Sequence, residues 1–312
     1  MKKAIRIVAM IFILFVIGFF IDKAICYAHI PDKPYIEGSV KYKEIVYLQN
    51  NEIQFIDDKG EKGEAFKIYV PTKRKVFGYT VPIYKRLQTM GVVNITWGNV
   101  DYPIGFTYVY GYPNVAYPVL LNNKNEMLIC SRETGPNTHW TNPIEVTDGG
   151  RILINLEGNN KNYLVFYDME ECKEENILYE GENIRYFALS RNGLLAVNEE
   201  IDSDLMLNIY DEHSKLIYSN NDNDYYEFFA WSSDGNKLLF PGKNDNGVID
   251  KIQIINFLTG DTQIINQEVF YASFSPSGDK LVMDTKNGIV ILDLLTMEEK
   301  IISQGDSPHW HP

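Results

Sequence analysis

The sequence predicts an all-β protein, a β-propeller built from four-stranded antiparallel blades. Three observations lead to this prediction. A short motif recurs about every 42 residues in the second half of the chain, short apolar segments follow each copy, and aromatic residues make up 13% of the 312 residues. Repeats of this length with four short strands are typical of propeller blades, and aromatic residues suit strands.

The repeated motif is a large apolar residue, then a serine, one variable residue, a residue that favours turns, and a glycine. A weaker copy, Val146-Thr147-Asp148-Gly149, precedes the clear ones. Glycine adopts the positive φ of a tight hairpin turn, and Asp, Asn or Ser before it bonds the local backbone. The three clear copies are Leu189-Ser190-Arg191-Asn192-Gly193, Trp231-Ser232-Ser233-Asp234-Gly235 and Phe274-Ser275-Pro276-Ser277-Gly278.

Apolar strands are predicted after each glycine. Together with the strand before the motif, they give each unit four antiparallel strands whose alternating apolar residues face the neighbouring sheets. The strands that follow the glycines are expected at residues 151–156, 194–197, 237–240 and 280–283, then at 162–168, 205–211, 251–257 and 288–294, and finally at 262–266 and 300–303.

The pattern Trp231-Ser232-x-Asp234-Gly235-x-Lys237-Leu238 resembles the WD40-like (PD40) repeat of the TolB family of periplasmic propellers. The resemblance covers roughly half of the chain and is clear in the last three units. It implies a propeller outside the cytoplasm that acts mainly as an interaction platform.

The two ends of the chain are predicted to share one blade. Residues 44–57 align without gaps to residues 280–293, and residues 307–312 resemble the start of another unit, with Trp310 in the place of Trp231. A ring closed in this way has no free sheet edge between its ends. Residues 140–303 hold four blades and the shared blade is a fifth, while residues 71–139 suffice for one enlarged blade or two tight ones. Six blades are therefore expected, with seven as the alternative.

The chain begins with a positively charged and then apolar segment. Lys2, Lys3 and Arg6 precede an unbroken apolar run from Ile7 to Ile21. The wider segment Ala4–Ile21 would span about 27 Å as a helix. The positive flank predicts a cytoplasmic N-terminus and export of the rest. We expect residues 1–21 to be an uncleaved, single-pass signal anchor in the cell membrane, 22–37 a linker and 38–312 the propeller domain. Cleavage would instead give a secreted protein.

The charge restricts the class of partner. The chain has 29 basic and 42 acidic residues and a net charge of −13. Three of the basic residues lie in the N-terminal segment, so the remainder is more acidic still. Binding to nucleic acid depends on clustered Lys and Arg, so no nucleic-acid partner is expected.

The three cysteines, Cys26, Cys130 and Cys172, are widely spaced and contain no C-x-x-C pair. This spacing supports neither a zinc cage nor a disulfide framework. We expect Cys130 and Cys172 to be buried free thiols, with a bond between them as the alternative.

The sequence contains no catalytic signature. It lacks G-x-S-x-G, H-E-x-x-H, a P-loop and G-x-G-x-x-G, so no catalytic residue, cofactor or metal site is assigned. Two loops, Asp222-Asn223-Asp224 and Asn244-Asp245-Asn246-Gly247, are rich in oxygen ligands for Ca²⁺. They lack the spacing of an EF-hand, and turn formation explains them equally simply.

Two groups of residues are candidates for a ligand surface. Exposed aromatic side chains stack on sugar rings or grip a peptide, although alternation in a half-buried strand also explains such a run. His309 and His311 are two apart and would face one side of a strand, as half of a metal site or as a solvated pair. The aromatic candidates are Tyr102, Phe106, Tyr108, Tyr110 and Tyr112, and basic residues precede them at Lys73, Arg74, Lys75, Lys85 and Arg86.

The expected function is that of a non-catalytic scaffold that binds a protein or a cell-envelope polymer. The alternative is a carbohydrate-active or lactonase-type enzyme that uses the central funnel of the propeller. That enzyme would need acidic or histidine side chains that converge at the axis. Such convergence depends on the three-dimensional structure and is not read from one sequence.

Overall fold

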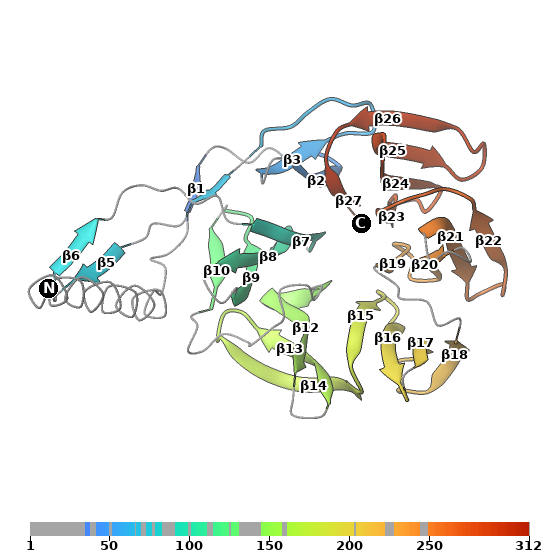
Figure 1. Cartoon of the computed structure of the whole chain (residues 1–312), viewed down its shortest axis with the longest axis horizontal. Helices are drawn as coiled ribbons and strands as arrows, with labels where there is room; N and C mark the ends of the chain where they lie inside the picture. Colours follow the sequence, from blue (N-terminus) through green and yellow to red (C-terminus); the bar gives the residue numbers. More distant parts are fainter. Residues whose placement is uncertain are drawn as a thin grey trace, which may run out of the picture.

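The chain forms a ring of six antiparallel sheets in a computed structural model (Figure 1). Five of these sheets have four strands and the sixth has three. The prediction of a six-blade propeller is confirmed, and the seven-blade alternative is wrong. The structure describes residues 35–37, 42–49, 52–65, 67–69, 73–76, 79–82, 91–98, 101–110, 115–124, 126–130, 145–157, 161–202, 204–221, 228–243 and 249–311.

The five complete blades follow one another along the chain, and each begins with its innermost strand (Figure 1). Blade 1 is β7 (Gly91–Trp97), β8 (Ile104–Tyr110), β9 (Val115–Leu121) and β10 (Met127–Ile129). Blade 2 is β11 (Glu145–Val146), the short 3-10 turn η1 (Asp148–Gly150), β12 (Arg151–Glu157), β13 (Asn162–Asp168) and β14 (Lys173–Gly181). Blade 3 is β15 (Ile184–Leu189), β16 (Leu195–Ile201), β17 (Asp204–Tyr210) and β18 (Leu216–Asn220).

Blades 4 and 5 complete this series and contain the strands predicted after residue 230. Blade 4 is β19 (Ala230–Trp231), β20 (Lys237–Lys243), β21 (Ile249–Asn256) and β22 (Thr262–Ile265). Blade 5 is β23 (Tyr271–Phe274), β24 (Lys280–Thr285), β25 (Gly288–Asp293) and β26 (Glu299–Ser303). Residues 71–139 therefore contribute one blade to the ring, not two.

The serine of the repeat fixes the turn between the first two strands of a blade. The backbone N–H of Ser190 donates to the carbonyl of Leu194, and the Ser190 hydroxyl oxygen accepts from the N–H of Leu194 at 2.8 Å. Ser232 and Ser275 make the equivalent bonds in blades 4 and 5, and all three serines are buried. The glycines that end the three motifs have φ angles of 70 to 79°, a region that favours glycine.

One backbone hydrogen bond recurs in every blade and defines equivalent positions around the ring. The donor is the residue that follows the innermost strand, and the acceptor is the carbonyl at the start of the next strand. The six pairs are Gly98 to Pro103, Thr147 to Arg151, Ser190 to Leu194, Ser232 to Lys237, Ser275 to Lys280 and His311 to Glu44. The last residues of the six inner strands are therefore structurally equivalent.

The sixth blade joins the two ends of the chain, as predicted. Its strands are β27 (Asp306–Trp310), β2 (Ile45–Gln49) and β3 (Glu52–Ile56), and Ile45 pairs with Trp310. The expected fourth strand is reduced to a single bridge between Ile56 and Lys62. Residues 57–65 are charged residues, glycines and one alanine, so they have no apolar side chains with which to pack an outer strand.

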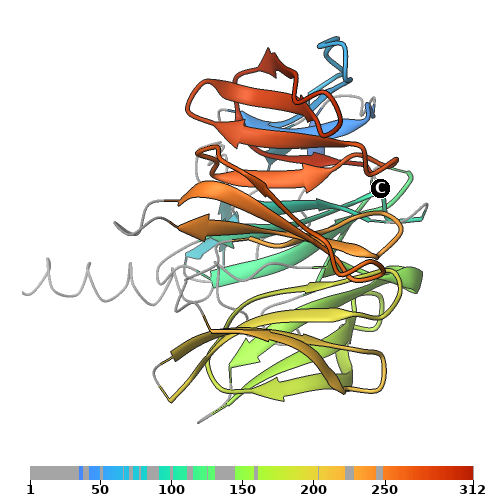
Figure 2. The ribbon, with the colours of Figure 1, turned by 90° about the vertical axis from the view of Figure 1, so that its right-hand side faces the viewer.

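The core is divided among the contacts between blades. The described residues form six hydrophobic clusters, one between each pair of neighbouring blades. The sixth blade contributes to two of them, with Val46 and Phe55 packed toward blade 1 and Trp310 toward blade 5. Figure 2 shows the blades edge-on, packed face against face. The sixth blade is thus joined to both of its neighbours by apolar packing.

Two small two-stranded sheets lie outside the ring (Figure 1). One pairs β1 (Tyr35–Glu37) with β4 (Lys67–Tyr69), so the last residues of the expected linker are in a strand. The other pairs β5 (Lys73–Val76) with β6 (Tyr79–Pro82) and contains Lys73, Arg74 and Lys75. Lys85, Arg86 and the N-terminal apolar segment lie outside the described residues. Among the residues that are described, no helix is long and apolar enough to cross a membrane.

Candidate binding site on the axis of the ring

The structure places the aromatic residues of the predicted surface in different environments. Phe106 is fully buried in the cluster between blade 1 and the sixth blade, which removes its ring from any exposed surface. The Tyr102 hydroxyl donates to the Glu170 carboxylate of blade 2, and this bond raises the pKa of Tyr102 to about 12. Tyr108 and Tyr110 lie on β8, and Tyr112 lies outside the described residues.

The two predicted histidines also have different surroundings. His309 is on β27, and its ring packs on the ring of Tyr271 with a centroid distance of 4.5 Å. His311 follows the strand and is exposed, and its ring packs on the ring of Trp97 with a centroid distance of 4.6 Å. Within the described residues, no group of three or more His, Cys, Asp or Glu side chains is placed to hold a metal ion.

His309 belongs to a set of equivalent positions, each one residue before the end of an inner strand. In order around the ring from blade 1, this position holds Thr96, Glu145, Ala188, Ala230, Ser273 and His309. Blades 3, 4 and 5 have a small residue there and an aromatic residue two positions earlier. Those aromatic residues are Tyr186, Phe228 and Tyr271. Since side chains alternate along a strand, both positions lie on the same side of each inner strand.

Four of these residues meet at the axis and form what we call the axial cluster: Glu145, Tyr186, Tyr271 and His309. The hydroxyl oxygen of Tyr271 lies 3.3 Å from Nδ1 of His309. Tyr271 also interacts electrostatically with Tyr186 and Glu145. Glu145 is in blade 2 and Tyr271 is in blade 5, on the opposite side of the ring, so this interaction crosses the axis (Figure 1).

Burial shifts the pKa of every side chain in the axial cluster in the direction that favours its neutral form. It raises the pKa of Glu145 to about 8 and lowers the pKa of His309 to about 3. The pKa values of Tyr186 and Tyr271 are raised first by burial and then by nearby negative charge. All four side chains nevertheless keep part of their surface accessible to solvent. A group that is surrounded by protein and still partly accessible lines an internal space.

The axial cluster contains no positive charge at neutral pH, because the His309 imidazole is neutral there. Among the described residues, none forms a hydrogen bond or an ion pair with the Glu145 carboxyl group. A buried ionisable group without a partner is unusual in proteins and often marks a functional site. The axial cluster is therefore the candidate site of this propeller.

Side chains of neighbouring blades hold the backbone and the ring of His309 in place. The indole N–H of Trp97 in blade 1 donates to the His309 carbonyl oxygen at 2.9 Å. The N–H of Trp310 donates to the hydroxyl oxygen of Ser273 in blade 5 at 3.0 Å. Phe228 is fully buried and supports the Tyr271 ring with a centroid distance of 5.2 Å. The side chain that lines the axis is thus fixed by contacts with three blades.

The sequence prediction identified His309 but missed Glu145, Tyr186 and Tyr271. A usable signal was present for two of these residues. Tyr186 and Tyr271 occupy the same place before the serine of the repeat, as does Phe228. Glu145 was harder to find, because the motif in blade 2 has Thr147 in place of the serine and the alignment there is weak.

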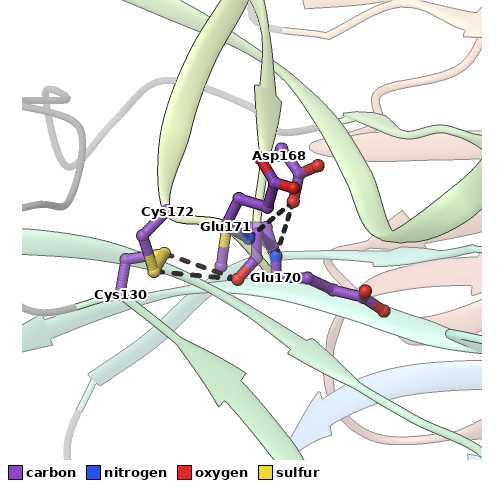
Figure 3. The surroundings of a disulfide bond; sticks show 6 residues. Cys130, Asp168, Glu170, Glu171 and Cys172 are labelled. Atoms are coloured by element: carbon purple, nitrogen blue, oxygen red, sulfur yellow. Dashed lines mark hydrogen bonds between the residues drawn. A yellow bond between two sulfur atoms is a disulfide. The ribbon is translucent and has the colours of Figure 1, made fainter.

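The structure corrects the prediction of free thiols at Cys130 and Cys172, because these two residues form a disulfide (Figure 3). Cys130 follows β10 of blade 1, and Cys172 lies in the turn between β13 and β14 of blade 2. Their Cα atoms are 5.5 Å apart, and both sulfur atoms lie close to the Met169 carbonyl oxygen. The Asp168 carboxylate shapes this turn, since its Oδ1 accepts from the backbone N–H groups of Glu170 and Glu171 at 2.8 Å.

The oxygen-rich loops at 222–224 and 244–247 lie outside the described residues. Calcium binding by these loops therefore stays a prediction from the sequence.

The comparisons with known proteins give a fold and no family. No protein-family model and no curated protein sequence matches the chain. Among solved structures, TolB from Acinetobacter baumannii matches with a TM-score of 0.62 and 16% identity, over 86% of this chain and 66% of TolB. This chain thus corresponds to just under two thirds of the length of that protein.

Two other similar structures have quite different descriptions. A nidogen/laminin complex matches with a TM-score of 0.51 and 12% identity, over 86% of this chain and 93% of the other. Hydrazine synthase from Kuenenia stuttgartiensis matches with a TM-score of 0.51 and 11% identity, over 82% and 76%. At such low identities the similarity shows the fold alone, a TolB-like β-propeller, and function must be argued from the site.

Proposed function

We propose that this chain is an extracytoplasmic, membrane-anchored, TolB-like β-propeller that acts as a non-catalytic scaffold for a protein or cell-envelope polymer. The axial cluster carries this proposal. It contains one carboxyl group, one imidazole and two tyrosines, and the Glu145 carboxyl group has no hydrogen-bond or ion-pair partner among the described residues. That composition suits recognition of a ligand better than the two or more acidic groups that hydrolysis of a glycoside uses.

Two features support the extracytoplasmic placement. Disulfides form and persist in oxidising compartments, and Cys130–Cys172 joins two blades of this ring. The N-terminal sequence has Lys2, Lys3 and Arg6 beside an apolar stretch, the arrangement of a signal anchor with a cytoplasmic N-terminus. In this proposal residues 1–21 are the anchor and the propeller lies on the far side of the membrane.

A protein partner is supported by the kind of structure that the fold resembles. One similar propeller was solved as a nidogen/laminin complex. A ring of blades presents its axial ends to a partner while its hydrophobic core remains in the blade contacts, so binding at the axis leaves the packing of the ring intact.

Site-specific photocrosslinking in whole cells tests the scaffold. The crosslinking residue replaces His311, an exposed residue two positions after His309, in the full-length protein in its own membrane. The proposal predicts a discrete covalent adduct with one protein or polymer. The control carries the crosslinker at Leu295, an exposed residue on the outer side of blade 5, and should give no such adduct. Equal labelling at both positions would contradict the proposal.

The placement has its own test. Membrane-impermeant maleimide should label a cysteine introduced at exposed Leu258 in intact cells, and the Cys130–Cys172 pair should be found oxidised. A label that appears only after the cells are broken would place the propeller in the cytoplasm.

One observation favours a second candidate, a carbohydrate-active or lactonase-type enzyme. Burial raises the pKa of Glu145 to about 8, and a carboxylic acid that stays protonated near neutral pH is suited to act as a general acid. Full-length protein incubated with a panel of glycosides and lactones tests this alternative. Turnover that is lost in the Glu145→Gln variant would establish the enzyme, and its absence across the panel would leave the scaffold.

A further inference from the structure

The axial cluster has a specific chemical composition that goes beyond a general binding role. Its single carboxyl group lies opposite the Tyr271 ring, and its imidazole is neutral. Tyr186 and Tyr271 are the side chains that interact electrostatically with Glu145, and the Tyr271 hydroxyl in turn lies 3.3 Å from Nδ1 of His309. Within the described chain, no Lys or Arg forms an ion pair with Glu145.

We propose that the axial cluster binds an ammonium group, with the Glu145 carboxylate as its counter-ion and the Tyr186 and Tyr271 side chains beside it. This inference rests on the proposed binding function and names the ligand chemistry. An ammonium group donates three hydrogen bonds, and the carboxylate, the tyrosine oxygens and the imidazole nitrogen can accept them. Aromatic rings also attract a cation over their faces, more strongly in a desolvated site.

Other ligand classes fit the same residues less well. An anion would lie beside the Glu145 carboxylate with no positive side chain from the described residues to balance it. A metal ion would need more ligating groups than the described cluster provides. A neutral sugar would stack on Tyr186 and Tyr271, but it would gain nothing from the negative charge of the chain around the site.

The charge of the whole chain favours the same ligand. A net charge of −13 raises the local concentration of cations around the protein and accelerates their association. Asp284 pairs with Tyr271 in the register of β23 and β24 and accepts a hydrogen bond from the backbone N–H of Ser307 at 3.2 Å. Burial raises the pKa of Asp284 to about 6, and the negative charge of Asp306 also raises it. The potential near β27 is therefore negative, as a cationic ligand requires.

Ammonium binding and the ionisation of Glu145 are linked. Burial holds the pKa of this carboxyl group at about 8, and a bound cation lowers it, so binding releases a proton from Glu145 below that pH. Affinity should therefore increase as the pH rises from 6 to 8.5, where a lysine-type ammonium is still charged. Tyr186 and Tyr271 stay neutral over this range, since their pKa values are raised, and so does His309.

Isothermal titration of the full-length protein in detergent tests the proposal with three probes. They are n-butylammonium, Nα-acetyl-lysine methylamide and the same lysine amide with its side chain acetylated. The expected result is saturable binding of a charged probe, at least about tenfold weaker for the acetylated one and for Glu145→Gln. Glu298→Gln, which alters an exposed glutamate far from the axis, should bind as the unaltered protein does.

The two charged probes distinguish the source of the ligand. Binding of both would show that a free amine suffices, and binding of the lysine amide alone would point to a lysine side chain on a protein partner. No binding of either, equal binding of the acetylated probe, or full binding by Glu145→Gln would overturn the proposal, provided that the variant melts like the unaltered protein. If the crosslinker at His311 still gave an adduct in that case, the proposed scaffold function would stand and only the ammonium ligand would be wrong.

Discussion

The backbone N–H of His311 donates to the carbonyl oxygen of Glu44 at 2.7 Å, which joins the last described residue of the chain to its first blade strand. The same bond closes the first turn of each of the other five blades, where donor and acceptor are four or five residues apart. In the sixth blade the whole ring lies between them. The C-terminal residues are therefore part of the propeller, and they also place His309 at the axis.

Deletion of residues 307–312 should destabilise the propeller. It removes most of β27, including buried Trp310 and its pairing with Ile45. Trp310→Ala alone should cost about 3–5 kcal/mol of the free energy of unfolding, the usual range for a large buried aromatic residue. Thermal and urea melting of the full-length protein measures this. Leu295→Ala, at a residue that is 90% exposed, is the control and should change stability by less than about 0.5 kcal/mol.

Loss of the Cys130–Cys172 disulfide should weaken the contact between blades 1 and 2. The bond closes a loop of 42 residues, and such a cross-link contributes about 2–4 kcal/mol, mainly by restricting the unfolded chain. Denaturant melting of Cys130→Ala/Cys172→Ala checks the value. Cys26→Ala is the matched control and should melt like the unaltered protein with and without reductant. Equal stability of all three proteins would mean that the bond does not form.

Glu199 should be far more important for stability than its neighbour Glu200. Glu199 is 1% exposed and accepts hydrogen bonds from the Tyr179 hydroxyl at 2.6 Å and the Asn208 amide at 3.1 Å. Glu199→Ala leaves buried donors without an acceptor and should cost about 2–4 kcal/mol. Glu200→Ala breaks a partly exposed pair with Arg185 and an exposed hydrogen bond from the Asn183 amide, and should cost less than about 1 kcal/mol. Urea melting of the two variants provides the comparison, and similar losses would refute the buried network.

Stability should fall with rising pH in a way that depends on Glu145. Its folded pKa, about 8, lies above its ordinary value of 4.5, so its contribution to stability is full below pH 4.5 and is lost as the pH rises through 8. The Glu145→Gln variant cannot ionise at this position. Between pH 5 and 9 the unaltered protein should therefore lose on the order of 3 kcal/mol more than the variant, since solvent access reduces the full shift.

Urea melting of both proteins at a series of pH values measures that difference. Asp284, whose pKa is also raised by burial, to about 6, and His309 are common to both proteins, so their contributions cancel. Parallel stability profiles for the two proteins would show that Glu145 is not buried as described.

The ring could be predicted from the sequence because the repeated serine makes its hydrogen bonds within a few residues of itself. Ser190, Ser232 and Ser275 each bond a nearby N–H, so their spacing in the chain reports the spacing of the blades. The alignment of residues 44–57 with 280–293 likewise predicted the closing blade, because equivalent strands have the same apolar pattern. Blade 1 was not resolved from sequence, since Gly98 replaces the serine there.

The axial cluster and the disulfide depend on contacts between blades, which leave little trace in a single sequence. Glu145 and Tyr271 are 126 residues apart and come from opposite blades, and only the geometry of the ring brings them to one axis. Cys130 and Cys172 are separated by one repeat length, which was a usable signal once the repeat was known. For Phe106 the sequence left both a ligand surface and a half-buried strand open, because alternation alone does not say which face of a strand is buried, and the structure buries this residue.

Ring closure brings Glu145 into an enclosed cluster with Tyr186, Tyr271 and His309. Titration of Glu145 checks this arrangement, by carbon NMR of the full-length protein with labelled glutamate carboxyl groups. The Glu145 signal is assigned as the one that disappears in Glu145→Gln. We expect a midpoint well above the ordinary range, near pH 8. A midpoint near 4.5, as for an exposed glutamate, would contradict it.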